Sequence, residues 1–158
     1  MFIIILLFSL ICSTYTPPNC KGGYYRDSFK YLQTVGGVTR EDMYPFNVSA
    51  PTCDETKTDF AVSLTKVNQV VGEQAMIDHV LGGGTLAVRL AAIDWQHYVS
   101  GVYSNCGPSP YINHAVQIVG VNVPGGYWIV RNSWGASFGY DGNMRLALVC
   151  PIEICSAI

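Results

Sequence analysis

Four apolar runs separated by glycine-rich turns occupy most of the second half of this sequence and constrain its fold more than any other feature. They are residues 85–92, 114–122, 126–131 and 143–149. Short apolar runs bounded by turn residues are typical of strands. An earlier run, 60–71, alternates apolar and polar residues and is rich in valine, so it is also predicted to be a strand.

Two short helices are predicted outside these runs. Residues 25–35 place apolar side chains at helical spacing, and the glycines at 36 and 37 end the segment. Residues 73–81 form a second helical segment, which the glycines at 82–84 end. Short helices followed by several strands predict an α+β class with a barrel-like sheet.

Composition narrows the classes of function. The 158 residues are 49% hydrophobic and 13% charged, which is enough for one domain with a core and argues against disorder. A net charge of −2 without a basic run favours neither nucleic acid nor an anionic membrane as a partner. Since no C-x-x-C pair is present, we predict no metal site and no cofactor.

Residues 1–18 form a hydrophobic leader that ends in two prolines. Its apolar run is shorter than the roughly 20 residues that span a membrane, and it has the length of a signal-peptide core. No lysine or arginine follows Met1, so two interpretations are open: a signal peptide, or a segment foreign to the mature fold. Asn47 begins the one glycosylation sequon, which acts only in a secreted chain.

Three histidines are the candidates for a histidine-based mechanism. His79 lies near the end of a predicted helix, where a protonated imidazole suits the helix dipole, and His97 lies in a turn-like stretch; we interpret both as structural. His114 opens a predicted strand, and the next strand ends just before Asn132. Pairing of these two strands would bring Asn132 beside His114, where an amide oxygen can orient an imidazole that acts as a base.

The residues around this pair resemble the histidine and asparagine signatures of papain-like cysteine peptidases. The spacing is closer to the cathepsin L-like branch than to cathepsin B. The motifs that carry the resemblance are His114-Ala115-Val116, Asn132-Ser133-Trp134-Gly135, Phe138-Gly139-x-x-Gly142-x-x-Arg145, Cys20-Lys21-Gly22-Gly23-Tyr24 and Tyr44-Pro45-Phe46.

This resemblance implies a partial papain-like domain over residues 19–158, with an incomplete helical left lobe (19–59) and an antiparallel β-barrel-like right lobe (60–158). It implies that His114 pairs with a catalytic thiolate, that Asn132 orients His114, and that Trp134 covers the pair. Arg89 occupies a position that is usually small or apolar, so the substrate pocket is expected to be narrowed or charged. The residues implied for substrate binding are Gly22, Gly23, Tyr24, Tyr25, Arg89, Ile112 and Asn113.

The nucleophilic cysteine of that family has no counterpart at the expected place. It lies in a Gln…Cys-Gly-Ser-Cys-Trp-like segment about 130–150 residues before the histidine, and no residue of this chain precedes His114 by that much. Cys12, the most upstream cysteine, lies in the apolar leader. The glutamine that donates to the oxyanion is absent with the same segment, so we expect the chain as written to be inactive.

The six cysteines fit the same pattern. The resemblance implies a disulfide between Cys106 and Cys155 in the barrel lobe. Cys20 and Cys53 resemble cysteines whose partners lie in the absent segment, so both are expected to be unpaired. Cys150 matches no cysteine of the family that we can place.

Three interpretations of the function are open. The chain can be part of a secreted or lysosomal cysteine-type peptidase, which acts in proteolysis as a monomer. It can be a secreted non-catalytic homologue. In both cases the partner is an extended peptide or a protein inhibitor, and no nucleic acid or membrane is expected apart from the leader. Third, it can be an unrelated β-rich secreted module in which the His-Asn-Trp pattern is a coincidence.

Overall fold

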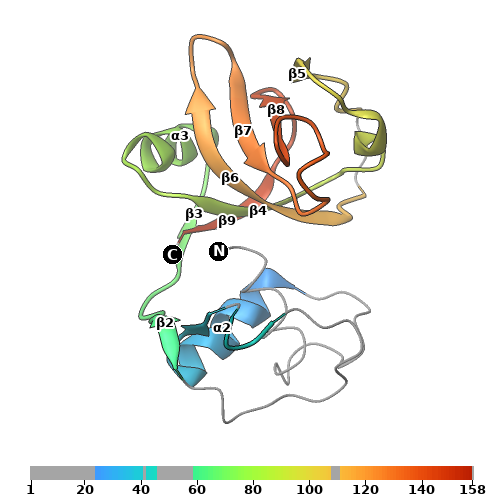
Figure 1. The fold of residues 1–158 in the computed structure, drawn as a ribbon. Coiled ribbons are helices and arrows are strands. Elements are labelled where there is room, and N and C mark those ends of the chain that lie inside the picture. Colours follow the sequence, from blue (N-terminus) through green and yellow to red (C-terminus); the bar gives the residue numbers. More distant parts are fainter. Residues whose placement is uncertain (1–23, 41, 46–58, 108–110, 158) are drawn as a thin grey trace. The chain divides into compact units, whose positions relative to one another are not determined.

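The computed structural model describes residues 24–40, 42–45, 59–107 and 111–157, with the backbone alone for 153–157. The chain divides into two compact units between Val67 and Asn68 (Figure 1). Some of the predictions concern residues outside the described ones and stay predictions. These are the leader 1–18, Cys20, Gly22, Gly23, Asn47 and Cys53.

The first unit contains helix α2 (Tyr25–Val35) and an antiparallel pair of strands, β1 (Val38–Thr39) and β2 (Phe60–Val62). The helix has the predicted bounds. It ends at Gly36, which has a φ of 101° and donates its N–H to Leu32 O at 3.0 Å. A left-handed residue at this place is the usual glycine cap of a helix C-terminus.

The second unit contains helix α3 (Glu73–Leu81), which also has its predicted bounds, and a seven-stranded sheet. The strand order is β3-β9-β4-β6-β7-β8-β5, and α3 packs against β6. A short 3-10 helix, η1 (Trp95–His97), follows β4. The strands are β3 (Asn68–Val70), β4 (Leu86–Leu90), β5 (Val102–Tyr103), β6 (His114–Asn122), β7 (Tyr127–Arg131), β8 (Asn143–Ala147) and β9 (Glu153–Ala157).

The expected α+β class is confirmed, with two differences in detail. The sheet is antiparallel except that β5 runs parallel to β8. The single strand expected over 60–71 is two strands in different units, because β2 pairs with β1 whereas β3 pairs with β9. The two compact units divide after Val67, and the lobe boundary expected between residues 59 and 60 stays a prediction.

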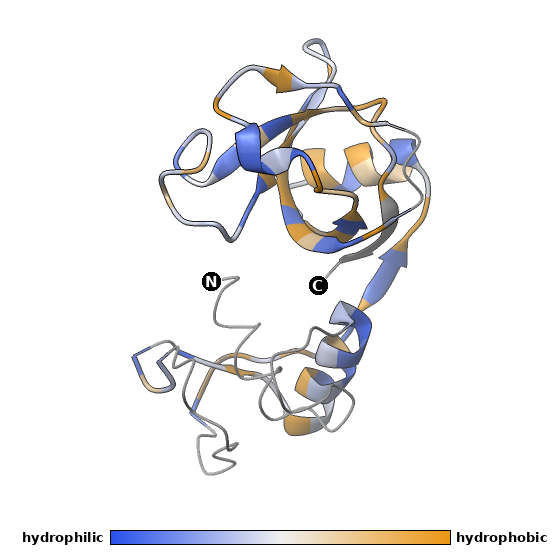
Figure 2. Cartoon of the chain, turned by 90° about the vertical axis from the view of Figure 1, so that its right-hand side faces the viewer, coloured by the Kyte–Doolittle hydropathy of each residue, from blue (hydrophilic) through white to orange (hydrophobic). Residues whose placement is uncertain are grey.

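The core of the second unit forms between α3 and the sheet. Alternate residues of β6, β7 and β8 are buried, because successive side chains of a strand point to opposite faces, whereas β4 is buried at every residue except Arg89. Figure 2 shows hydrophobic and hydrophilic residues interspersed along the chain of this unit. The most deeply buried side chains are Leu86, Val88, Leu90, Trp95, Val116, Ile118, Trp128, Val130, Met144 and Leu146.

The disulfide of this unit joins Cys106 to Cys150, so the expected pairing of Cys106 with Cys155 is wrong. Cys106 follows β5, and Cys150 follows β8, the strand that pairs with β5. This pairing brings the two Cα atoms to 5.3 Å, within the usual range for a disulfide. Cys155 instead lies in β9, opposite Val70 of β3.

In the turn after α3, Gly84 packs closely against the side chain of His79. A Cβ atom on Gly84 would lie 2.6 and 2.7 Å from Cε1 and Cδ2 of His79 and would also overlap its Nε2. His79 Nε2 is buried there without a hydrogen-bond partner among the described residues. The imidazole, which we interpreted as structural, packs against this glycine.

We expect Gly84→Ala to lower the free energy of unfolding by about 1–3 kcal/mol, because the added methyl group has no room beside His79. Urea denaturation followed by fluorescence measures this change. Gly107→Ala is the matched control, since a Cβ at Gly107 has no atom within 4 Å. Equal stability of the two variants would contradict the packing argument.

Candidate active site

The hairpin of β6 and β7 brings His114 and Asn132 together. His114 is the first residue of β6, and Asn132 directly follows the last residue of β7. Gln117 pairs with Arg131 across the hairpin, so the beginning of β6 lies beside the end of β7. His114 Nε2 and Asn132 Oδ1 are 2.8 Å apart, and the asparagine is only 9% exposed.

The hydrogen bonds of Asn132 determine which nitrogen of His114 carries the proton. Asn132 Oδ1 also accepts the backbone N–H of Ser133 at 2.8 Å, so the atom at this position is the oxygen. An amide oxygen only accepts, and His114 Nε2 is therefore the protonated nitrogen. In the neutral imidazole this leaves Nδ1 as the basic nitrogen, free to take a proton from a reacting group.

Two glycines of the signature shape the loop that carries Asn132. Gly142 has a φ of 84° and accepts the backbone N–H of Asn132 at 2.9 Å. Gly139 has a φ of 52°, and a Cβ there would lie 2.7 Å from Cε1 of Tyr98 and overlap Asn143 O. Both positions favour glycine because of their left-handed backbone. The spacing of the signature thus follows from the loop that fixes Asn132.

His114 is part of a closed ring of six aromatic side chains. Its imidazole lies 5.1 Å from the Trp134 ring, at an angle of 31°, and 6.1 Å from Trp95, edge to face. The ring continues from Trp95 through Tyr103, Tyr98 and Phe138 back to Trp134, with centroid distances of 5.3–6.5 Å. Aromatic pairs at such distances attract one another and hold the imidazole in one orientation.

Sequence patterns did not identify Trp95, Tyr98 and Tyr103 as support for the site. In the stretch from Asp94 to Tyr98, these patterns indicated only His97 as a candidate. This residue is exposed, and its Nε2 lies 3.2 Å from Gln96 Nε2. The aromatic residues on either side of His97 were the signal, since Trp95 is 1% exposed and Tyr98 is 9% exposed.

The other predicted site residues lie in different places. Asn113 Oδ1 accepts the N–H of Ala92 at 2.9 Å and so ties the end of β4 to the beginning of β6. Ile112 lines a cavity of about 90 Å³ together with Trp95 and Tyr103. Arg89 lies in β4 opposite Ala115, next to the pair of Leu90 and His114. Tyr24 and Tyr25 belong to the first unit.

Tyr98 secures the ring through its hydroxyl group, which donates to Gly101 O at 2.7 Å and accepts the N–H of Arg145 at 3.2 Å. Burial raises the pKa of Tyr98 above its usual value. The folded state therefore favours the neutral phenol. This contribution to stability is present below the ordinary tyrosine pKa of about 10 and is lost as the pH rises through the folded-state pKa.

We expect Tyr98→Phe to lower the free energy of unfolding by about 1–3 kcal/mol at neutral pH, because Gly101 O and Arg145 N lose their partner. The variant should also lose less stability than the parent above pH 10, because it lacks this phenol. Denaturation curves from pH 7 to 11.5 measure both effects. Parallel pH curves for the two proteins would contradict the assignment.

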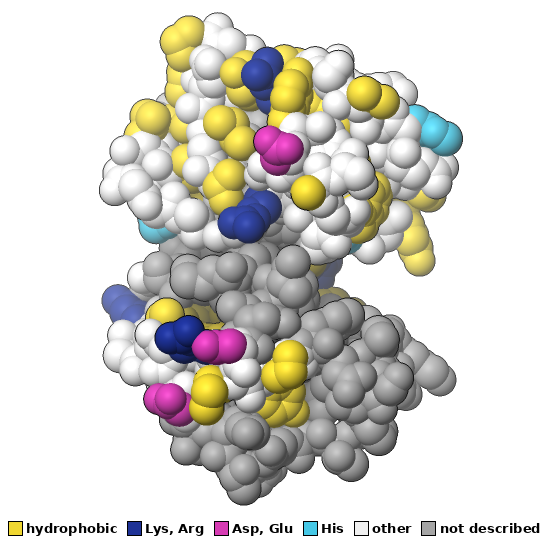
Figure 3. Space-filling model, in the orientation of Figure 1, with side chains coloured by type: hydrophobic (Ala, Val, Ile, Leu, Met, Phe, Trp, Pro, Cys, Tyr) yellow, Lys and Arg dark blue, Asp and Glu magenta, His cyan; other side chains and the backbone are white. Residues whose placement is uncertain are grey.

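Within the described part of the chain, no group of three or more His, Cys, Asp or Glu side chains is arranged to hold a metal ion. No helix there is long and apolar enough to cross a membrane. Hydrophobic and uncharged polar side chains predominate on the face of the second unit in Figure 3, with a few separate charges. The described cysteine side chains, Cys106 and Cys150, form the disulfide.

The sequence of this chain matches a known protein family. The model of the papain family cysteine protease matches residues 9–156 of this chain. The chain belongs to the papain family of cysteine proteases. The match to this family begins at residue 9, within the segment 1–18 that we expected to be a leader.

Curated proteins of the papain family are similar in sequence to this chain. The chain is 33% identical over 154 residues to the thiol protease aleurain of Arabidopsis thaliana, covering 88% of this chain and 42% of aleurain. It is 36% identical over 143 residues to vignain of Vigna mungo, covering 85% and 39%. The chain therefore spans about two fifths of the length of these relatives.

Solved structures of papain-family proteases share the fold. The bromelain protease of Ananas comosus, in complex with the E64 inhibitor, is 31% identical, with a TM-score of 0.81. The match covers 95% of this chain and 74% of bromelain. Procathepsin L2 from the larval midgut of Tenebrio molitor is 33% identical with a TM-score of 0.75, covering 87% and 47%. The papain-like fold expected from the signatures is thus confirmed.

Proposed function

We propose that this chain supplies the His114–Asn132 half of a papain-type active site, which cleaves peptide bonds when a nucleophilic thiol stands at Nδ1 of His114. The observation that carries the proposal is the hydrogen bond from His114 Nε2 to Asn132 Oδ1, which leaves Nδ1 as the base. Substrates are extended peptides, and the protein acts as a secreted or lysosomal thiol protease. A disulfide such as Cys106–Cys150 suits that oxidising location.

The chemistry follows from this arrangement. A thiol beside Nδ1 transfers its proton to His114, which gives a thiolate and an imidazolium. The thiolate attacks the peptide carbonyl carbon, and the imidazolium donates its proton to the leaving amine as the carbon–nitrogen bond breaks. Water, deprotonated by His114, then hydrolyses the thioester and restores the thiol. Asn132 keeps the imidazole oriented through both proton transfers.

The substrate side of this proposal includes Arg89, Ile112 and Asn113. Arg89 lies in β4 next to Leu90, the residue that pairs with His114, so its position is close to the reacting centre along the sheet. A guanidinium at a position that is usually small or apolar narrows this subsite.

We further propose that the 158-residue chain alone is inactive, because none of its six cysteines lies in a Cys-Gly-Ser-Cys-Trp-like segment. A thiol-directed, substrate-like epoxide tests this directly. Intact-mass analysis after incubation should show no adduct on the chain. An adduct would contradict the proposal and identify the nucleophile by peptide mapping. If the chain stays unlabelled but binds a reversible peptide inhibitor, it acts as a non-catalytic homologue.

A further inference from the structure

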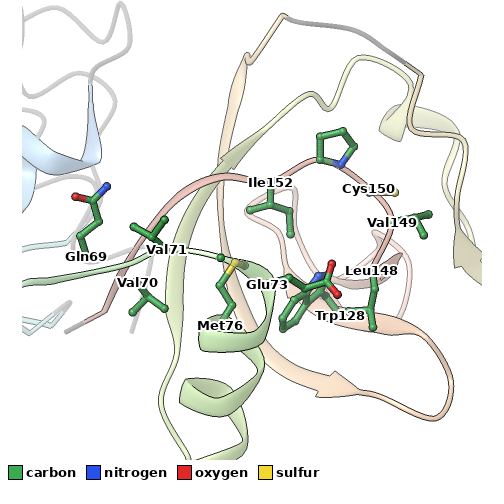
Figure 4. Close-up of a pocket in the computed structure, with 12 residues that line it drawn as sticks. Gln69, Val70, Val71, Glu73, Met76, Trp128, Leu148, Val149, Cys150 and Ile152 are labelled. Atoms are coloured by element: carbon green, nitrogen blue, oxygen red, sulfur yellow. The ribbon is translucent and has the colours of Figure 1, made fainter.

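A cavity of about 370 Å³ opens in the second unit, apart from the His114 site (Figure 4). It lies between the end of β3 and the first turn of α3 on one side and the segment that joins β8 to β9 on the other. None of its lining residues is His114, Asn132 or a member of the aromatic ring. The catalytic proposal therefore leaves this cavity unexplained.

Most of the lining side chains are apolar, apart from Gln69, and a single one is charged. Val70, Met76, Leu148 and Ile152 form the walls, and the indole of Trp128, which is 1% exposed, lies at the bottom. Glu73 is the one lining residue with a formal charge, and in Figure 4 its carboxylate points to the side where Trp128 and Leu148 lie. Within the described part of the chain, no ion pair or hydrogen bond to this carboxylate is found.

These groups together select a long side chain with an apolar stem and a cationic end. Apolar walls bind the methylene groups of lysine or arginine, whose charged ends stay near polar surroundings. A cation in this cavity meets the Glu73 carboxylate, and a hydrogen bond between two such charged groups is stronger than one between neutral groups. The Glu73 carboxylate would repel an acidic side chain in the same place.

The position of the cavity favours a polypeptide over a free amine. Residues of β3 form one of its walls, and among the described residues β3 is an edge strand that pairs only with β9. An edge strand leaves main-chain N–H and C=O groups open to an extended peptide. The rim is also apolar, since Val71 and Val149 are 75% and 82% exposed. We propose that this cavity binds a lysine or arginine side chain of an extended polypeptide segment that lies along β3.

Calorimetry with the full 158-residue chain tests the proposal. Blocked nine-residue peptides of alternating threonine and valine carry arginine, lysine, norleucine or glutamate at the centre. The arginine and lysine peptides should bind on the order of tenfold more tightly than the norleucine peptide, with the glutamate peptide weakest. Glu73→Gln should remove most of the preference for a cation and its dependence on salt. N-acetyl-lysine amide should bind far more weakly than the lysine peptide.

Two valine variants give a matched test of the location. Val149→Trp places an indole at the rim of the cavity and should weaken binding of the arginine peptide at least tenfold. Val99→Trp replaces a valine of similar exposure, 76%, that lines neither cavity, and should leave binding unchanged. Circular dichroism shows that each variant is folded. Equal binding of the lysine and glutamate peptides, no binding of any peptide, or equal binding of the free amine and the lysine peptide would overturn the proposal. Self-association that Val149→Trp abolishes would assign the cavity to a second copy of the chain instead.

Discussion

His114→Ala is expected to reduce kcat/KM by about 10³-fold or more in a protein that joins this chain to the nucleophile-bearing segment of a papain-family relative. The part of bromelain that this chain does not match is a suitable donor, because the remainder aligns over 95% of the chain. Without His114 no base stands at the thiol, so neither the thiolate nor the protonated leaving group forms. Hydrolysis of a fluorogenic peptide measures the effect.

The control for this experiment lies on the same strand. Gln117→Ala removes an exposed hydrogen bond to Thr85 Oγ1 and is expected to leave activity within about twofold of the parent. Asn132→Ala should fall between the two, since it removes the group that orients the imidazole while keeping the base. The proposed function is wrong if the joined protein folds and is inactive, or if His114→Ala stays within tenfold of the parent.

Loss of the Cys106–Cys150 disulfide is expected to cost about 4 kcal/mol of unfolding free energy, from the closed loop of 44 residues. The double variant Cys106→Ser, Cys150→Ser tests this by urea denaturation under non-reducing conditions. A loss this large is a substantial part of the 5–15 kcal/mol that is typical of a whole domain, so partial unfolding at 37 °C is expected as well.

Cys155→Ser serves as the control because Cys155 lies in β9, paired with β3. It should leave the disulfide intact. A non-reducing peptide map should show the peptides of Cys106 and Cys150 joined both in the parent and in Cys155→Ser. A map that joins Cys106 to Cys155 would restore the pairing that the family resemblance implies and contradict the structure.

Local patterns predicted the elements that local forces determine. Helices α2 and α3 have their predicted bounds because apolar spacing and terminal glycines act within a few residues. The strand from His114 to Asn122 also has its predicted bounds. By contrast, β5 and β9 were not predicted. β5 has two residues and pairs with β8 far along the chain, so the pairing rather than the local sequence makes it a strand.

The candidate site divides in the same way. The sequence by itself determined the family, the papain-like α+β fold and the pair His114 and Asn132, because the signature glycines and the hairpin pattern are local. Only the tertiary structure decided that Cys150 is the partner of Cys106 and that His114 belongs to a closed ring of six aromatic side chains. Both depend on which strands become neighbours. Burial of apolar side chains from the whole unit selects which strands become neighbours, so the residues near each position do not identify its partner.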